Sequence, residues 1–396
     1  MKVLSPLHYL IVISLTIIFP SCTAQPQYPL SGQIELHPDW KPMVYLVKPR
    51  HFNEIAADYL GLVMDSATIS SDGKFSFPTL TFSDKQLLVE IVVQKKESRF
   101  PNHLSDENPN EANYMPIVLS SDKSMRIQAQ SVNFQKTFLI EQPSLDNEAM
   151  LSLRDNRLQA YATLKSESSG ESDADSLIIE KEDAYNRYTK VLRDFADNTS
   201  SLPAALVAIR WVSPTGDFER TPEFLHGQCI KWKKLQPGHQ FTSELCAAAD
   251  KGSLPVMVGD VIPDYAMPLA TGDTLMLHSL FGKRLTIVDI WASWCAPCRK
   301  ENREILGPLW STYKNKGLQI IAYALDSNEA SWRNAITKDG ASWIHASHLT
   351  GDDSPFLKSL RITTIPANYL LDANGKVLAK NVFGKELQNL VTEYLK

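Results

Sequence analysis

The sequence predicts three parts: an antiparallel β-sandwich over residues 27 to about 140, a helical connector over 145–252 and an α/β domain over 255–396. Three observations lead to this prediction. Short runs of alternating apolar and polar residues fill the first part, and apolar residues at helical spacing fill the second. In the third part, strand-like apolar runs alternate with helix-like segments, which is typical of an α/β domain.

Length and composition agree with a folded, multidomain protein. The chain has 396 residues, of which 43% are hydrophobic and 21% charged, close to globular averages, so disorder throughout the chain is excluded. Forty Lys and Arg against 45 Asp and Glu give a formal net charge of −5. This balance offers no electrostatic footprint for a polyanion, and no nucleic-acid partner is expected.

The N-terminus carries the features of an export signal. Lys2 is followed by a mostly apolar run from Leu7 to Phe19, too short to span a membrane, and then by Ser21-Cys22. A small residue before Cys resembles a bacterial lipoprotein signal, so residues 1–22 are interpreted as a signal peptide with Cys22 as the lipidated residue. The alternatives are ordinary cleavage after Ala24 or an uncleaved anchor. All three predict a location outside the cytoplasm.

The β-sandwich prediction rests on several short runs with turn signals between them. The runs include Ser31–Leu36, Met43–Val47, Leu87–Val93 and Met115–Leu119, and Ser71–Lys74 is a turn. No group of His, Cys and carboxylates with ligand spacing occurs there. Two interpretations stay open for this part: a docking or ligand-binding module, and a structural spacer.

The connector contains two cysteines that face each other if two of its helices form a hairpin. One helix is expected to start at Thr221-Pro222-Glu223, with Thr221 as N-cap, and to end at Pro237-Gly238. A last helix begins near Thr242. Cys229 and Cys246 are equidistant from the turn, so a disulfide is geometrically reasonable in an oxidising compartment. The alternative is two buried cysteines that act as small hydrophobic residues.

The α/β prediction follows from the order of its segments. Leu285–Trp291 reads as a central strand, and a helix runs from Cys298 to about Leu309. The segments expected after these are a strand at Gln319–Leu325, a helix around Trp332, strands at Pro366–Leu371 and Lys376–Val382 joined by an Asn374-Gly375 hairpin, and an amphipathic helix at Gly384–Leu395.

The chemistry is expected at Trp294-Cys295-Ala296-Pro297-Cys298. Two cysteines separated by two residues, at the start of a helix behind a buried strand, can exchange between dithiol and disulfide. The unpaired N–H groups and dipole of the helix N-terminus favour the thiolate of Cys295, and the thiolate is the nucleophile. A zinc site would need a second ligand pair, which the sequence lacks, and a purely structural bridge would close too small a loop to stabilise much.

The stretch from Val288 to Glu301 resembles the active site of thioredoxin-fold proteins, and more narrowly that of the extracytoplasmic TlpA/ResA-like thiol–disulfide oxidoreductases. Flanking segments agree, including Tyr323–Asp326 and Thr364-Ile365-Pro366. The resemblance covers about residues 255–396. The first part resembles, more loosely, a β-domain of unknown function that precedes TlpA-like domains in Bacteroidota lipoproteins.

This resemblance implies roles for individual residues. Cys295 is the attacking thiol and Cys298 the resolving thiol. Pro366 is the cis-proline that faces the disulfide, and Ile365 before it offers its backbone groups to a bound substrate chain. Trp294 flanks Cys295, with plain packing as the alternative role.

Further residues match the family pattern, and one departs from it. Asp289 matches the buried carboxylate of thioredoxins and would exchange a proton with Cys298. Glu301 either tunes both thiols or is a first-turn helix acid. The dipeptide Ala296-Pro297 helps to set the redox potential. Arg303 occupies the position of a helix-kinking proline, and Gly307-Pro308 follows one turn later.

These implications together predict a periplasm-facing, lipid-anchored thiol–disulfide oxidoreductase that reduces disulfides in exported proteins and needs no cofactor. Its expected partners are disulfide-containing exported proteins, with apocytochromes among the candidates, and an electron donor in the membrane. The alternatives are a disulfide-introducing oxidase or isomerase, and a surface-binding lipoprotein in which the dithiol is a redox sensor.

Overall fold

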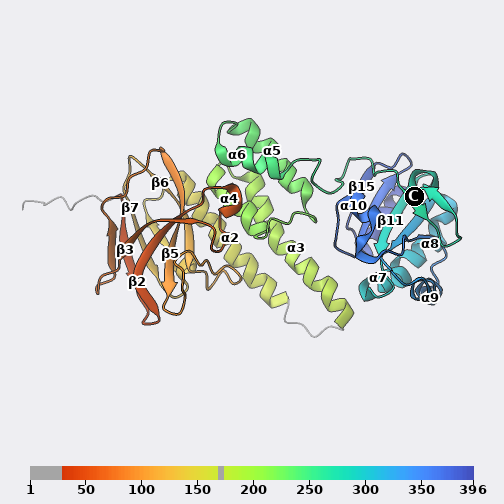
Figure 1. The fold of residues 1–396 in the computed structure, drawn as a ribbon, viewed down its shortest axis with the longest axis horizontal. Coiled ribbons are helices and arrows are strands. Elements are labelled where there is room, and N and C mark those ends of the chain that lie inside the picture. The colour runs from red at the N-terminus through yellow and green to blue at the C-terminus, as the bar shows by residue number, and fades with distance from the viewer. Residues whose placement is uncertain (1–28, 168–173) are drawn as a thin grey trace, which may run out of the picture.

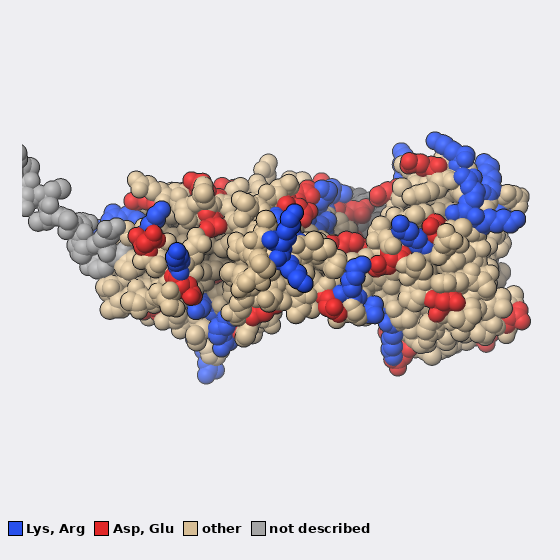
Figure 2. Space-filling view, turned by 90° about the horizontal axis from the view of Figure 1, so that it is seen from above, with Lys and Arg blue, Asp and Glu red and all other residues tan. Residues whose placement is uncertain are grey.

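The computed structural model describes residues 29–167 and 174–396, and the expected signal segment with Cys22 lies outside these residues. Figure 1 shows three parts side by side along the long axis: a β-rich part, a group of helices and an α/β part. Among the described residues, no helix is long and apolar enough to cross a membrane. On the face shown in Figure 2, acidic and basic side chains are interspersed, with a group of Lys and Arg at the α/β end.

The N-terminal part consists of two four-stranded sheets that share one hydrophobic core. The first sheet has the order β4-β1-β7-β8, with bounds β1 Leu30–Glu35, β4 Lys74–Phe77, β7 Met125–Gln130 and β8 Leu139–Glu141. The second has the order β3-β2-β5-β6, with bounds β2 Trp40–Lys48, β3 Leu62–Thr68, β5 Gln86–Lys95 and β6 Tyr114–Ser120. The predicted sandwich is therefore confirmed as an architecture.

One strand pairing differs from the antiparallel prediction. β1 and β7 run parallel, with Leu30 opposite Met125 and Glu35 opposite Gln130, so the first sheet is mixed. Turn signals predict only pairings between neighbours in the sequence, where a short turn forces the antiparallel direction. The direction of a pairing between the first and seventh strands is set by the path of the whole chain, which no local pattern records.

The helical connector covers the outer face of the second sheet. Its helices are α2 Leu145–Glu167, α3 Ala174–Asn198, α4 Leu202–Val212, α5 Pro222–Leu235 and α6 Gln240–Ala248. β5 is buried from Leu87 to Gln94 without alternation, because one of its faces meets the first sheet and the other meets these helices. Trp211 of α4 donates its indole N–H to the hydroxyl of Tyr114 at 2.8 Å, which fixes the helices on the sheet.

A disulfide joins Cys229 of α5 to Cys246 of α6, with the two Cα atoms 4.8 Å apart. α5 begins at Pro222 as expected, but the Thr221 side chain makes no capping hydrogen bond. Glu223 in the first turn instead accepts a hydrogen bond from the N–H of Val258 at 2.9 Å and pairs with Lys380 at 3.2 Å. This end of α5 is therefore held by the α/β part rather than by its own cap.

The α/β part contains a five-stranded sheet of order β13-β12-β11-β14-β15. Its strands are β11 Leu285–Trp291, β12 Leu318–Ala324, β13 Ile344–Ala346, β14 Ala367–Asp372 and β15 Val377–Lys380, and a hairpin of β9 Ala266–Pro268 and β10 Thr274–Met276 precedes them. β11 is central, parallel to β12 and antiparallel to β14. The β14–β15 hairpin turns through Gly375, whose φ of +79° suits glycine. The predicted α/β architecture is confirmed.

Helices pack on this sheet around a second hydrophobic core (Figure 1). They are α7 Ala296–Glu301, α8 Gly307–Tyr313, α9 Glu329–Asp339, α10 Pro355–Leu360 and α11 Gly384–Leu395. A π-helical turn at Asn302–Leu306 joins α7 to α8, where one continuous helix was expected. Pro308 has no N–H to donate, and the wider turn takes up the change in hydrogen bonding directly before it.

Candidate active site

The two candidate redox cysteines lie where β11 meets α7. β11 is buried along its whole length, and Ala292-Ser293-Trp294 leads from it to Cys295, the N-cap residue of α7. Cys295 and Cys298 form a disulfide with their Cα atoms 5.3 Å apart, and the Cys298 N–H donates to the Cys295 sulfur at 3.3 Å. A thiolate on Cys295 would therefore meet a backbone donor and the positive end of the helical segment.

Burial separates the residues around the disulfide. Cys295 is 6% exposed and Cys298 is 2% exposed, whereas Trp294 directly before them is 62% exposed. Pro297 lies in the first turn of α7, where its missing N–H costs no hydrogen bond. Ala296 and Pro297 thus fill the turn between the sulfurs, and Trp294 is the large apolar side chain that a partner would meet first. The plain packing role for Trp294 is not supported by this exposure.

The cis-proline loop contains Thr363, Thr364, Ile365 and Pro366 and leads into β14. The Ile365–Pro366 peptide bond is cis, as the family resemblance implies. Because β14 pairs with β11, this loop lies at the same end of the sheet as the residues that follow Trp291. Within the described part of the chain, no hydrogen bond engages the backbone N–H or C=O of Ile365.

Two buried carboxyl groups lie on the elements that carry the disulfide. Asp289 on β11 is 4% exposed, and burial, with a smaller effect from Glu301, raises its pKa to about 8. Glu301 at the end of α7 is 8% exposed, and burial raises its pKa to about 7 although it accepts a hydrogen bond from the Gly384 N–H at 3.0 Å. Groups that titrate near neutral pH beside a dithiol are suited to exchanging protons with it.

Glu301 also has a structural role. Its carboxylate oxygen accepts the N–H of Gly384, the first residue of α11, so it satisfies one of the unpaired donors at the start of that helix. Glu301 is the last residue of α7, so its interpretation as a first-turn acid of that helix is wrong. Its carboxyl instead holds the start of α11, and its charge contributes to the raised pKa of Asp289. Tuning of both thiols stays a prediction.

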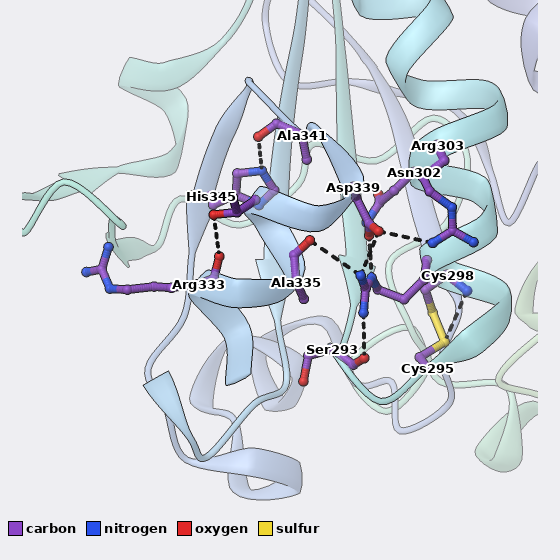
Figure 3. Close-up of polar contacts among 12 residues, drawn as sticks. Ser293, Cys295, Cys298, Asn302, Arg303, Arg333, Ala335, Asp339, Ala341 and His345 are labelled. Atoms are coloured by element: carbon purple, nitrogen blue, oxygen red, sulfur yellow. Dashed lines mark hydrogen bonds and ion pairs between the residues drawn. A yellow bond between two sulfur atoms is a disulfide. The ribbon is translucent and has the colours of Figure 1, made fainter. Parts of the chain in front are cut away.

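A network of polar side chains holds the turn before Cys295, and Figure 3 shows it beside the disulfide. Asp339 at the end of α9 has a fully buried side chain and accepts hydrogen bonds from Arg299 at 2.7 Å and Arg303 at 3.0 Å. Arg299 also donates to the carbonyl oxygen of Ser293 at 3.1 Å. Burial pushes the pKa of Asp339 up, but the two guanidinium groups outweigh it and hold this pKa below its usual value.

Asp326 holds the same turn from the other side. Its carboxylate accepts the N–H of Ser293 at 2.9 Å and also the Ser293 hydroxyl. Asp326 belongs to one of the segments that resemble the family, whereas the roles of Arg299, Asp339 and Ser293 could not be predicted from the sequence. Their side chains meet only in the fold, and a charged residue after a motif signals nothing by itself.

The remaining site predictions fall elsewhere. Cys229 and Cys246 lie in the connector and form their own disulfide. Cys22 lies outside the described residues. No group of three or more His, Cys, Asp or Glu side chains suited to a metal ion occurs among residues 29–167 and 174–396.

Comparisons with known proteins place the α/β part in a family. The family model described as Redoxin matches residues 257–392. A thiol-disulfide oxidoreductase ResA of Bacillus thuringiensis is 27% identical over 139 residues, which cover 35% of this chain and 77% of the relative. The thiol:disulfide interchange protein DsbE of Pseudomonas fluorescens is 24% identical over 143 residues, covering 34% and 71%.

Solved structures include a thiol-disulfide oxidoreductase from Bacteroides fragilis. Its sequence is 34% identical to this chain, the match covers 34% of this chain and 98% of the solved structure, and the TM-score is 0.32. The residues that the Redoxin model matches include Cys295 and Cys298. Residues 257–392 thus form a thioredoxin-superfamily domain of the TlpA/ResA-like type, and the chain is a thiol–disulfide oxidoreductase.

Proposed function

We propose that this chain works outside the cytoplasm and reduces disulfides in exported proteins, with Cys295 as the attacking thiol and Cys298 as the resolving thiol. The observation that carries the proposal is the placement of Cys295 at the start of α7 with Cys298 buried behind it. A cis-proline loop with a free Ile365 backbone lies at the same end of the sheet.

The reaction proceeds in two exchanges. The Cys295 thiolate attacks one sulfur of the substrate disulfide, which forms a mixed disulfide and releases the other substrate sulfur as a thiolate. Cys298 then loses its proton and attacks the Cys295 sulfur, which releases the second substrate thiolate. Two electrons pass to the substrate, and the chain ends with the Cys295–Cys298 disulfide that the structure contains. A dithiol donor must reduce this disulfide before the next cycle.

Asp289 is proposed as the proton acceptor for Cys298. Its pKa of about 8 means that a fraction of the carboxyl is ionised near neutral pH and can take the thiol proton as Cys298 attacks. Ala296-Pro297 and the backbone of Ile365 are proposed to contact the substrate, as an added strand would. Trp294 would cover the mixed disulfide on its exposed side.

The reducing direction has a physical argument beside the family resemblance. A strong oxidant has a stabilised reduced form because its attacking cysteine is held as a thiolate. In this chain, Asp289 and Glu301 lie on β11 and α7, the elements that position the disulfide, and above their pKa values of about 8 and 7 they carry negative charge, which opposes thiolate formation. The reduced form therefore gains less stability than in an oxidant, which favours electron donation.

Export and lipid anchoring at Cys22 are part of the proposal. The apolar run from Leu7 to Phe19 before Ser21-Cys22 supports them, and so does the Cys229–Cys246 disulfide, a bond typical of oxidising compartments. Replacing Cys22 by Ser should move the protein from the membrane fraction to the soluble exported fraction. Retention in the membrane would contradict the lipid anchor.

The first test is the reduction potential of the Cys295/Cys298 pair in the purified mature protein, with Cys295→Ser as the control. A reductant should give a value near or below about −270 mV, as in thioredoxin. A value near about −120 mV would instead mean that the chain introduces disulfides. If no redox-active pair titrates, the dithiol chemistry fails and a binding function remains.

A further inference from the structure

The helical connector contacts the cis-proline loop directly. The loop between α4 and α5 presents Glu219, whose carboxylate accepts hydrogen bonds from the N–H of Thr363 at 2.8 Å, from its hydroxyl at 2.7 Å and from the N–H of Thr364 at 2.9 Å. Three donors on one carboxylate make a strong, charge-assisted contact. The contact joins residues 144 positions apart in the chain.

Arg220 makes the matching contact on the other side of Ile365. Its guanidinium donates to the carbonyl oxygen of Pro366 at 3.0 Å and lies 3.5 Å from the carboxylate of Glu182 on α3. The connector therefore binds backbone groups of Thr364 and Pro366. Its described residues make no hydrogen bond to the N–H or C=O of Ile365, the residue between them.

The loop that carries Glu219 and Arg220 is itself held in place. Asp217 accepts the N–H of Glu219 at 2.9 Å, Phe218 is buried, and the next residues lead into α5, whose Glu223 contacts Lys380 and Val258. In Figure 2, acidic and basic side chains meet where the connector reaches the α/β part. Because the loop with Glu219 and Arg220 is already fixed, it loses little conformational entropy when it binds the cis-proline loop. It therefore holds the cis-proline loop in one conformation.

α7, the helix that carries Cys298, lies on the side of the α/β part that the connector contacts. α3 of the connector contacts α7, and Figure 1 shows the two helices facing each other. The connector thereby covers part of α7, whereas Trp294 remains largely exposed. An extended chain segment can pair its own backbone with the N–H and C=O of Ile365, as an added strand does, whereas the surface of a folded protein offers few unpaired backbone groups.

We propose that Glu219 and Arg220 are positioning residues for the substrate, and that the connector is the second wall of the substrate site. It holds the cis-proline loop so that Ile365 offers both backbone groups to an extended, unfolded segment that carries the disulfide. This inference rests on the proposed function, because it needs the Cys295/Cys298 pair to exchange with a polypeptide disulfide.

The test compares two substrates in single-turnover reactions of the pre-reduced mature chain. One is an unstructured peptide with an internal disulfide, and the other is bis(2-hydroxyethyl) disulfide, which has no peptide backbone to pair with Ile365. The reaction is quenched with acid, and the thiols left on the chain are alkylated and counted by protein mass, separately from the substrate thiols, so no electron donor is needed. The variants are Glu219→Gln and Arg220→Met, and Lys190→Met, in an exposed α3 ion pair, is the matched control.

Each positioning variant should raise the half-saturation concentration for the peptide about tenfold, the size expected for one charge-assisted hydrogen bond. The limiting rate, the rate with the small disulfide and the reduction potential should stay unchanged. Lys190→Met should leave every value unchanged, and Arg220→Lys should recover part of the peptide affinity.

Three results would overturn the inference. Equal losses with both substrates would mean that the connector only supports the fold. Unchanged peptide saturation would remove any substrate role. Faster peptide reduction would make the connector a barrier rather than a wall. An unmodified chain that reduces neither substrate would contradict the proposed function instead, so the two failures are distinguishable.

Discussion

The two disulfides of the described chain differ in sequence separation, in position and in surroundings. Cys229–Cys246 ties the middle of α5 to α6 and closes a loop with a sequence separation of 17. Cys295–Cys298 has a separation of 3 and lies at the start of α7, beside the cis-proline loop and two carboxyls with raised pKa. The first cross-links two elements, and the second has surroundings that change how easily each sulfur ionises. The surroundings of a disulfide, rather than the bond itself, therefore set how readily it exchanges.

The largest expected effect separates the two pairs by activity. Cys295→Ser should reduce disulfide exchange to the rate without protein, because the attacking sulfur is gone. Cys298→Ser should instead accumulate the mixed disulfide between Cys295 and substrate, visible as a higher-mass species on a non-reducing gel. If exchange persists in Cys295→Ser, another thiol carries out the reaction, and Cys295 is not the attacking thiol.

The second prediction concerns Asp289 and pH. An Asp in the unfolded chain ionises near pH 4, whereas in the folded chain the pKa is about 8. Between these values the folded state holds an extra proton, so the free energy of unfolding falls as the pH rises from about 4 to 8. Asp289→Asn removes this titration, so the free energy of unfolding of the variant should not show this fall. The change in unfolding free energy caused by the substitution should therefore be about 3–5 kcal/mol more stabilising at pH 8.5 than at pH 4.5.

The measurement for Asp289→Asn is a urea titration at both pH values, read by pulsed hydrogen exchange at β11 so that only this part is followed. Glu301→Gln should act in the same direction but less, because its pKa is about 7 and loss of the carboxylate weakens the bond from Gly384. An unchanged pH dependence in Asp289→Asn would mean that Asp289 is ionised in the folded protein.

The third prediction tests the connector disulfide. Cys229→Ser with Cys246→Ser should lower the free energy of unfolding of the helical connector by about 3 kcal/mol, the chain-entropy value for a loop of this length. Exchange activity and the reduction potential of Cys295/Cys298 should not change. Urea titration and the exchange assay on the same preparation check both. A shifted potential would show that the two disulfides are coupled through the connector.

Local patterns predicted several elements of the α/β part almost to the residue, but not the short strands β9, β10 and β13 or the helix α10. β11 at Leu285–Trp291 and α11 at Gly384–Leu395 have the expected bounds, because a continuous apolar run and an amphipathic repeat each record their own secondary structure. The expected helix from Cys298 to about Leu309 is broken by the π turn at Asn302–Leu306, since one proline shifts hydrogen bonding in the residues before it.

Long-range contacts could not be predicted in the same way. The parallel pairing of β1 with β7 depends on the path of more than ninety residues between Leu30 and Met125, for which no short motif exists. The contact of Glu219 with Thr363 has the same origin, as does the meeting of Arg299 with Asp339. The reacting atoms were therefore readable from a five-residue motif, whereas the side chains that position them were not.

The smallest expected effect tests whether side chains, besides the backbone, hold the reactive disulfide. Arg299→Met removes the hydrogen bonds to Asp339 and to the Ser293 carbonyl, and leaves Arg303 as the guanidinium partner of the buried Asp339. The free energy of unfolding of the α/β part should fall by about 2 kcal/mol, as for charge-assisted hydrogen bonds. Exchange with the small disulfide should also slow, because the turn before Cys295 loosens.

Lys358→Met, in an exposed ion pair of α10, is the control and should change neither value. If Arg299→Met loses stability but keeps the full exchange rate, Asp326 is sufficient to hold the turn, and Arg299 does not position the reactive disulfide.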